Sequence, residues 1–190
     1  GEVVRLVGTL ADITEFKASE ERLLHDAVHD SLTGLPNREL FLDRLEASLM
    51  NAQGDEQRRP TVLVLDIDRF KQVNDSVGIS VGDSILLTVS RRLARLLKPQ
   101  DTLARLNGDH FGIILLSERA PERITGFAET IRKALRAPIA FSEREIFLTG
   151  SIGIALADGT QRKREDLLKD AELAAYHAKR LGGDRIEVFK

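Results

Sequence analysis

Runs of apolar residues predict the strands of this chain. Residues 61–67, Thr-Val-Leu-Val-Leu-Asp-Ile, form a nearly continuous apolar run, which is typical of a strand buried on both faces. Two more apolar runs lie within 101–117 and flank Asn107-Gly108. Asn-Gly favours a type I′ turn, which needs positive φ at both central residues. We therefore expect a strand over 101–106, a tight turn at 107–110 and a second strand after it.

Helical spacing of apolar residues predicts the helices. The ranges with this spacing are 38–50, 83–97, 121–137 and 167–181. Residues 51–60 are polar and predict a loop, and 69–82 is a connecting stretch with two glycines. Further strands are expected over 145–156, where glycines interrupt the pattern, and over 185–189. The turn-rich segment 30–38 leads into the first of these helices, and we expect Asp30 and Arg38 to hold that turn in place.

The first thirty residues follow a different pattern. Residues 2–10 alternate as a strand does, and 15–29 form a charged helix with only a thin apolar stripe. Such a helix connects domains or pairs with another helix rather than packing in a core. We expect three parts: a last strand over 1–14, a linker helix over 15–29 and one domain over 30–190.

The order of elements from residue 61 onward predicts the fold class. Strand, helix, two strands, helix, strand, helix and strand indicate an α/β (α+β) sandwich of split βαβ type, with helices flanking a mostly antiparallel central sheet. The long helical crossover makes strands 61–67 and 101–106 parallel. Both strands then end at one edge of the sheet, so the turn at 107–110 is expected beside Asp66 and Asp68.

Acidic residues at this edge suggest a site. Carboxylates at the mouth of a buried strand are costly without a partner. Asp66 and Asp109 are placed to share a cation, in an oxygen-only site suited to Mg²⁺ or Mn²⁺. The other interpretation is that Asn107, Gly108 and Asp109 serve only the turn, and Asp68 is expected to be structural.

Composition narrows the function classes. The chain has 190 residues, 28 Lys plus Arg against 30 Asp plus Glu, and no cysteine. Near-neutral charge argues against nucleic-acid or membrane-surface partners, and the lack of thiols fits a reducing cytoplasm. No apolar run approaches the about 20 residues of a membrane helix, and no signal peptide opens the chain. Gly1 begins inside an expected strand, so we interpret the chain as a fragment of a longer protein.

Five sequence blocks together carry a family resemblance. They are DSLTGLPNR at 30–38, DIDRFKQVNDSVGISVGD at 66–83, RLNGDHF at 105–111, SIGI at 151–154 and AELAAYHAKRLG at 171–182. In this order they resemble the GGDEF domain of diguanylate cyclases, a nucleotidyl-cyclase-like fold. The first thirty residues resemble, more weakly, the end of a PAS sensor domain and its exit linker.

The resemblance implies a reaction and its residues. The family condenses two GTP molecules into cyclic di-GMP across two facing domains, which implies a homodimer. Asp66, Asp109 and the Ile67 carbonyl correspond to metal ligands for Mg²⁺ or Mn²⁺. The resemblance assigns the nucleotide contacts to the following residues: Asn74 and Asp83 for guanine, Lys71 and Lys179 for the triphosphate, and Phe70 and Gly108 near it, with the backbone N–H groups of 69–71.

The chain also departs from the family. Gly-Gly-Asp/Glu-Glu-Phe is here Asn107-Gly108-Asp109-His110-Phe111, so a glycine and an acidic catalytic residue are both replaced. A neutral imidazole supplies no anionic charge to Mg²⁺. Ile79 and Gly183 stand where the family has histidine and arginine. The product-inhibition motif Arg-x-x-Asp corresponds to Lys98 through Asp101, and lysine lacks the two-pronged guanidinium contact.

These observations leave three hypotheses. The first is a degenerate GGDEF domain that binds GTP, or pairs chains, and regulates a cyclic di-GMP signalling protein with a PAS domain upstream and an EAL domain downstream. The second is an active diguanylate cyclase that tolerates the altered signature, with Mn²⁺ as its ion. The third is a scaffold that binds no nucleotide.

Overall fold

The computed structural model describes residues 1–5, 7–159 and 163–190, and its centre is a five-stranded sheet. The strand order is β2-β3-β1-β6-β7. The strands are β1 (Thr61–Ile67), β2 (Thr102–Asn107), β3 (His110–Leu115), β6 (Gly150–Leu156) and β7 (Arg185–Val188). Every pair is antiparallel except β6 with β7. The predicted mostly antiparallel sheet is confirmed, and β1 and β2 run parallel as expected, with β3 between them.

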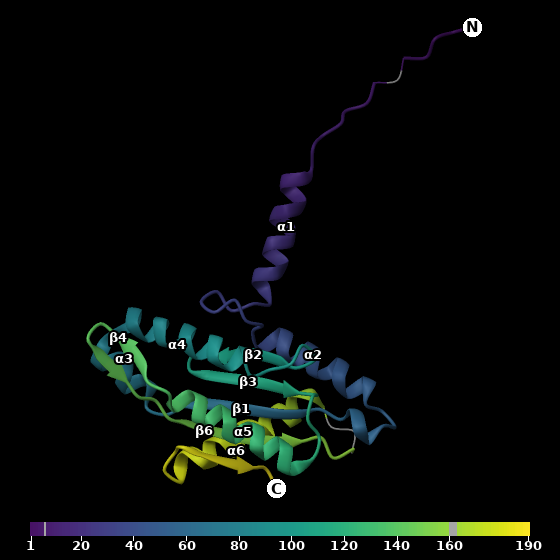
Figure 1. The fold of residues 1–190 in the computed structure, drawn as a ribbon. Coiled ribbons are helices and arrows are strands. Elements are labelled where there is room, and N and C mark those ends of the chain that lie inside the picture. The colour runs from purple at the N-terminus through teal and green to yellow at the C-terminus, as the bar shows by residue number, and fades with distance from the viewer. Residues whose placement is uncertain (6, 160–162) are drawn as a thin grey trace.

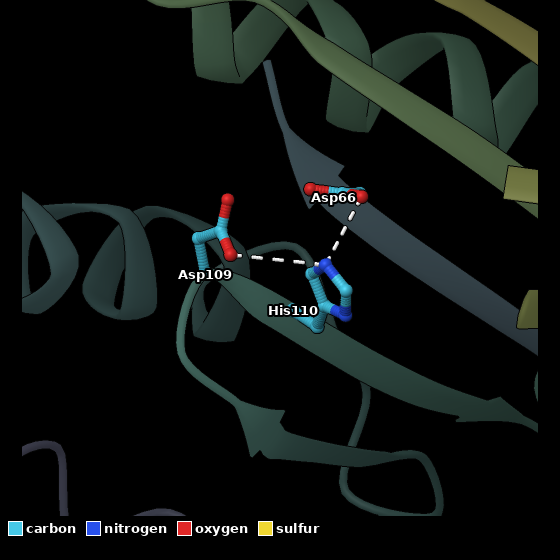
Figure 2. Close-up of side chains that lie close together, drawn as sticks. All are labelled: Asp66, Asp109 and His110. Carbon is cyan, nitrogen blue, oxygen red and sulfur yellow. Dashed lines mark ion pairs between the residues drawn. The ribbon is translucent and has the colours of Figure 1, made fainter. Parts of the chain in front are cut away.

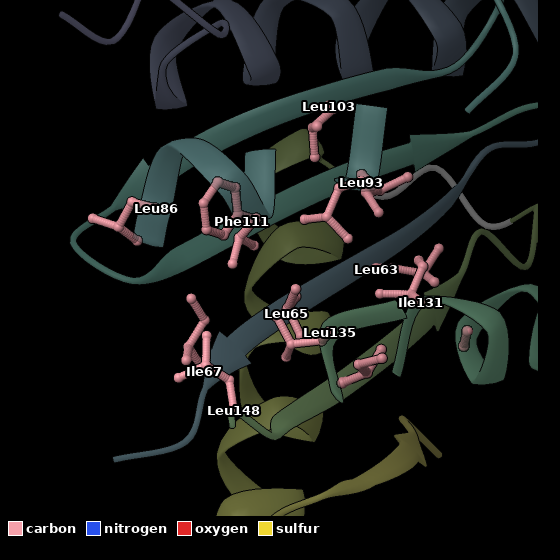
Figure 3. Close-up of a cluster of buried hydrophobic side chains, with 14 of the residues drawn as sticks. Leu63, Leu65, Ile67, Leu86, Leu93, Leu103, Phe111, Ile131, Leu135 and Leu148 are labelled. Carbon is pink, nitrogen blue, oxygen red and sulfur yellow. The ribbon is translucent and has the colours of Figure 1, made fainter. Parts of the chain in front are cut away.

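Helices cover both faces of this sheet (Figure 1). On one face lie α3 (Phe70–Val77), α4 (Ile79–Ala94) and α5 (Pro121–Arg136), and on the other lie α2 (Arg38–Asn51) and α6 (Arg164–Arg180). Alternate residues of β1 enter the two cores: Leu63, Leu65 and Ile67 face the first, shown in Figure 3, and Val62 and Val64 face the second. The apolar run at 61–67 is therefore buried on both sides, as its pattern predicted.

Two regions differ from the sequence prediction. Residues 70–77 form α3, and α4 begins at Ile79 instead of Asp83 and ends at Ala94. Gly78, with φ of 90°, separates the two helices, and this break gives the segment the appearance of a loop in sequence. The expected strand over 145–156 is two strands, because β5 (Arg144–Ile146) pairs with β4 (Ile139–Phe141) in a separate hairpin. The expected loop before β1 contains a short 3₁₀ helix, Glu56–Arg58.

The hairpin between β2 and β3 is confirmed, but its turn type is not. Asn107 ends β2 and His110 begins β3, so Gly108 and Asp109 are the two loop residues. Of these only Gly108 has positive φ, at 37°, whereas a type I′ turn needs it at both positions. The prediction of a type I′ turn centred on Asn107 and Gly108 is therefore wrong.

The first segment of the chain stands apart from the domain. Helix α1 (Thr14–Ala27) has no buried residue and projects away from the sheet (Figure 1). The described residues before it, 1–5 and 7–13, contain no strand, so the described part of the range 2–10 does not form the expected strand. A strand needs a partner for its backbone groups, and within the described chain none lies beside this segment. The assignment of this segment to a PAS-like domain stays a prediction.

The turn after α1 is fastened to the sheet. Asp30 accepts hydrogen bonds from the Thr33 N–H and hydroxyl, at 2.8 and 2.7 Å, and forms an ion pair with Arg105 of β2 at 3.2 Å. Arg38 pairs with Glu172 of α6 at 2.7 Å. Both residues hold the turn in place, as the sequence suggested.

Among the described residues, no helix has the length and apolarity needed to cross a membrane.

Candidate nucleotide and metal site

Strand register brings three candidate site residues together. Asp66 of β1 lies opposite His110 of β3 in the antiparallel ladder, and the Ile67 N–H donates to the Asp109 carbonyl at 3.3 Å. One ligand atom from each of Asp66, Asp109 and His110 lies within 4.8 Å of the others. Figure 2 shows the three side chains converging from the end of β1 and the start of β3. The expected juxtaposition of Asp66 and Asp109 is therefore present.

The Asp66 carboxylate is held by two side chains, the Lys179 ammonium and the His110 imidazole. Its Oδ1 accepts a hydrogen bond from Lys179 Nζ of α6 at 2.7 Å, and its Oδ2 lies 3.0 Å from His110 Nε2. Burial raises the pKa of this carboxyl, but hydrogen bonds from His110 and Lys179 outweigh burial and lower the pKa below its usual value. Both carboxylate oxygens are thus engaged by the protein itself.

Asp109 and His110 complete the cluster. His110 Nε2 lies 3.7 Å from Asp109 Oδ1. Burial, and then the charge of Asp66, raises the pKa of the Asp109 carboxyl. The hydrogen bond to Asp66 raises the pKa of His110 against the opposing effect of burial. The two carboxylates are therefore inequivalent, since the pKa of one is lowered and that of the other is raised.

The donor set does not fit Mg²⁺ well. Magnesium prefers six oxygen ligands in near-ideal octahedral geometry and keeps several waters. Here an imidazole nitrogen replaces an expected oxygen, and Lys179 and His110 both contact Asp66. Asp66, Asp109 and the Ile67 carbonyl as ligands of Mg²⁺ or Mn²⁺ stay a prediction.

Asp68 has a structural role, as expected. Its carboxylate accepts hydrogen bonds from the Thr149 and Ser151 hydroxyls, both at 2.7 Å, and from the Asp184 N–H at 2.8 Å. These contacts fasten the end of β1 to β6 and to the turn before β7. A Cβ on Gly183 would approach this carboxylate to 2.8 Å, and Gly183 has φ of 76°. The chain around position 183 is therefore shaped for glycine, where the family has arginine.

The predicted guanine-contact residues lie on neighbouring helices. Asn74 is on α3 and Asp83 on α4, and Asn74 Oδ1 is buried without a hydrogen-bond partner among the described residues. A Cβ on Gly82 would lie 1.7 Å from that oxygen, and Phe70 lies just beyond. The sequence did not reveal this role of Gly82, and its only indication was that Gly82 directly precedes the candidate residue Asp83. Because the protein encloses this oxygen, the Asn74 side chain must rotate away from Gly82 before the oxygen can accept a hydrogen bond from a ligand.

The predicted phosphate contacts are only partly assembled. Lys71 is exposed at the start of α3, where Arg69 has a left-handed φ of 56° and gives no side-chain cap. Gly108 is exposed at the hairpin. Lys179, assigned to the triphosphate by the resemblance, contacts Asp66 instead. The structure therefore places Lys179 in the carboxylate cluster, and it gives no contact between that cluster and Lys71.

The corresponding product-inhibition residues are used for folding. Asp101 accepts hydrogen bonds from the Lys98, Leu116 and Ser117 N–H groups and from the Ser117 hydroxyl, at 2.7–3.1 Å. These bonds tie the start of β2 to the end of β3. Lys98 is exposed, and its backbone rather than its ammonium group makes this contact.

Fold and site together define an α+β sandwich domain with a carboxylate cluster at a β-hairpin. The family model described as "Diguanylate cyclase, GGDEF domain" matches residues 27–185. The chain belongs to this family, as the sequence blocks indicated.

Curated relatives and solved structures agree with this assignment. The chain is 41% identical over 169 residues to the bifunctional diguanylate cyclase/cyclic di-GMP phosphodiesterase MucR of Pseudomonas aeruginosa, a match that covers 89% of the chain and 24% of MucR. It is 38% identical to the diguanylate cyclase TpbB of the same species, over 83% of the chain and 36% of TpbB. The chain thus spans well under half the length of these relatives.

Two crystal structures resemble the whole domain. The coiled coil and GGDEF domain of DgcB from Caulobacter crescentus, in complex with c-di-GMP, matches with a TM-score of 0.83 and 27% identity over 93% of each chain. The GGDEF domain of TpbB matches with a TM-score of 0.78 and 33% identity, over 83% of this chain and 98% of that one.

Proposed function

We propose that this chain is a degenerate GGDEF domain that binds GTP and has little or no cyclase activity. It acts as a regulatory or dimerising module in a cyclic di-GMP signalling protein. The observation that carries the proposal is the contact of His110 Nε2 with Asp66 Oδ2 at 3.0 Å, at the signature position where the family has an acidic residue.

The chemistry explains why this contact matters. Phosphoryl transfer depends on positioned positive charge at the phosphates, and losing one such group costs about 10²-fold to 10³-fold in rate. His110 adds no anionic ligand, and both oxygens of Asp66 are bonded to His110 and Lys179. Asn107 adds a side chain where the family's glycine allows close approach. Two altered positions in one signature are enough to reduce turnover below detection.

GTP binding is supported by a separate group of residues. Guanine carries N–H donors on its edge, and these can donate to the Asp83 carboxylate and, once the Asn74 side chain rotates away from Gly82, to the Asn74 amide oxygen, which lacks a partner in the described chain. Lys71 is exposed and free to approach phosphate. None of these groups touches His110, so binding can survive where chemistry is lost.

Purified protein incubated with GTP and either Mg²⁺ or Mn²⁺ tests the catalytic half of the proposal. We expect no cyclic di-GMP above background from the natural chain, and detectable product from the double variant Asn107→Gly, His110→Glu, which restores the family signature. Substantial product from the natural chain would instead identify an active cyclase. That alternative is favoured by the closeness of Asp66 and Asp109, and it predicts that Asp109→Ala abolishes product.

Calorimetric titration with GTP tests the binding half. We expect measurable affinity that Asp83→Ala reduces at least tenfold, because a charged hydrogen bond to the base is lost. Absence of any binding would favour the third function, a scaffold that uses only its surfaces.

The same proposal extends to the partners of the longer protein. GTP is the ligand, and binding of cyclic di-GMP at the Lys98–Asp101 position is expected to be weak because Asp101 is already fully hydrogen-bonded. We expect the full-length protein to be a homodimer with a PAS domain upstream and an EAL domain downstream. This domain is expected in the cytoplasm, whether the protein is free there or anchored to a membrane. MucR, a bifunctional diguanylate cyclase/cyclic di-GMP phosphodiesterase, is a relative in which the two activities occur in one protein, which supports a downstream EAL domain here.

A further inference from the structure

The Asp66, Asp109 and His110 cluster has donor atoms spaced as the ligands of one metal ion would be. His110 Nε2 lies 3.0 Å from Asp66 Oδ2 and 3.7 Å from Asp109 Oδ1. Two ligands bonded at about 2.1 Å to one ion are about 3.0 Å apart at a right angle and about 3.4 Å apart at a tetrahedral angle. The two distances from His110 Nε2 bracket these values, and the ligand atoms of Asp66 and Asp109 lie within 4.8 Å of each other, so a small shift of the half-buried Asp109 side chain completes the set.

The donors are also held in place by the fold. Asp66 and His110 are directly opposed in the β1–β3 ladder, and Asp109 is fixed beside them by its carbonyl, which accepts the Ile67 N–H. Asp66 is buried, and the other two side chains are half-buried. An ion bound here would take the place of the hydrogen bond between His110 and Asp66.

The chemistry of the donors decides which ion this would be. Imidazole nitrogen suits Zn²⁺, Ni²⁺, Cu²⁺ and Fe²⁺, whereas Mg²⁺ selects oxygen. We propose that Asp66, Asp109 and His110 form a mixed nitrogen and oxygen site that binds a divalent first-row transition metal in preference to Mg²⁺. The histidine in the signature therefore changes the metal that the domain accepts. This proposal does not depend on GTP binding.

Lys179 limits the affinity of this site. Its ammonium lies 2.7 Å from Asp66 Oδ1, so a metal ion must compete with a fixed positive charge. Removing that charge is expected to strengthen metal binding, while removing the imidazole is expected to weaken it. These opposite effects separate a real site from loose attraction of cations to acidic residues.

Zinc titration without nucleotide tests the proposal. The chain has four histidines, and His25 near the end of α1 stacks on His29 in the turn that follows it, with ring centroids 3.6 Å apart. Because such a pair can also bind Zn²⁺, all measurements use the His25→Gln, His29→Gln background. Zn²⁺ affinity is measured by calorimetry and by competition with a chelator, and Co²⁺ absorption reports whether a nitrogen ligand is present.

The expected results are specific to each variant. His110→Gln should weaken Zn²⁺ binding at least tenfold and change the Co²⁺ spectrum, with Mg²⁺ affinity unchanged. Lys179→Met should strengthen Zn²⁺ binding severalfold. His110→Glu should strengthen Mg²⁺ binding at least tenfold, because it adds an anionic oxygen. Equal Zn²⁺ affinity in the background protein and in its His110→Gln variant would overturn the proposal, whatever the result with GTP.

Discussion

At the scale of single residues, Gly82 decides where Asn74 lies. The missing side chain of Gly82 leaves room for Asn74 Oδ1, which would be 1.7 Å from a Cβ at that position. The amide therefore rests on the first turn of α4 with its oxygen buried and unpaired within the described chain. A glycine at this point couples the packing of α3 and α4 to the predicted guanine contact.

Gly82→Ala tests this coupling. The added methyl must displace Asn74, so we expect the free energy of unfolding to fall by about 1–3 kcal/mol and GTP affinity to fall with it. Urea denaturation and GTP calorimetry measure the two effects. The matched control is Gly126→Ala in α5, where nothing lies within 4 Å of the new Cβ and stability should rise by about 0.5–1 kcal/mol. A Gly82→Ala protein with unchanged GTP affinity would show that the Asn74 amide does not depend on the space over Gly82.

The site was predictable from sequence where it depended on strand order, and not where it depended on side-chain pairing. A strand ending in Asp66 and a hairpin at Asp109 predicted that the two carboxylates would meet. The pairing of Lys179 with Asp66 was not foreseen, because a lysine on a helix has several anions within reach and sequence does not rank them. The role of Gly82 was missed because it depends on the lack of a side chain, which leaves room for Asn74, and a sequence pattern does not show which residue uses such a space.

At the scale of elements, α6 packs directly on the backbone of β6. A Cβ on Gly153 of β6 would lie 2.1 Å from the Ala171 carbonyl oxygen and 2.2 Å from the Ala175 N. Small residues therefore line both sides of this contact, which is how α6 comes close enough for Lys179 to contact Asp66. The position of the lysine follows from the closeness of helix and strand.

Gly153→Ala is expected to be strongly destabilising. The methyl meets backbone atoms that cannot rotate away, so α6 must shift, and the loss should be about 3 kcal/mol. Thermal and urea unfolding measure it. Gly112→Ala in β3 is the comparison, because its Cβ would meet only side-chain atoms of Leu106 and Phe41 at 3.0 Å, and its loss should be nearer 1 kcal/mol. Equal losses in the two variants would contradict a close contact between α6 and β6.

Elements with strong periodicity were predicted well, and short ones were not. The stripes of α2, α5 and α6 and the run of β1 come from burial on defined faces, which the sequence pattern records. Helix α3 has eight residues, Phe70–Val77, and Gly78 follows it, so its pattern is too short to distinguish from a loop. The β4–β5 hairpin has three-residue strands with mostly exposed residues, which leave little pattern to detect.

At the scale of the whole molecule, the domain and α1 are joined by the turn around Asp30. Its carboxylate binds Thr33 within the turn and Arg105 of β2, so it links the chain leaving α1 to the edge strand of the sheet. Burial raises the pKa of Asp30, but the Thr33 and Arg105 hydrogen bonds and the Arg105 charge together lower it below 3.8. The ionised form is therefore the one that the folded chain stabilises.

A pH-dependent effect follows for Asp30→Asn. Because the folded pKa is lowered, the stabilisation from Asp30 is complete above its unfolded pKa and is lost as the pH falls through the folded pKa. At pH 7 we expect the variant to be less stable by about 1–2 kcal/mol. The difference should begin to shrink below about pH 4 and be lost as the pH falls through the lowered folded-state pKa. Urea unfolding across this range measures it, with Asp26→Asn on exposed α1 as a control that should show no difference; a gap that stays constant with pH would contradict an ionised Asp30.

Helix α1 has no buried residue, so swinging it to a new angle uncovers no apolar surface. Its direction is set instead by hydrogen bonds at its C-terminal end, where the Asn37 side chain donates to the Ala27 carbonyl at 3.0 Å and the Asn37 N–H donates to the Val28 carbonyl at 2.9 Å. A rotation of this helix would therefore turn the domain as one unit, and the packing inside the domain would stay unchanged.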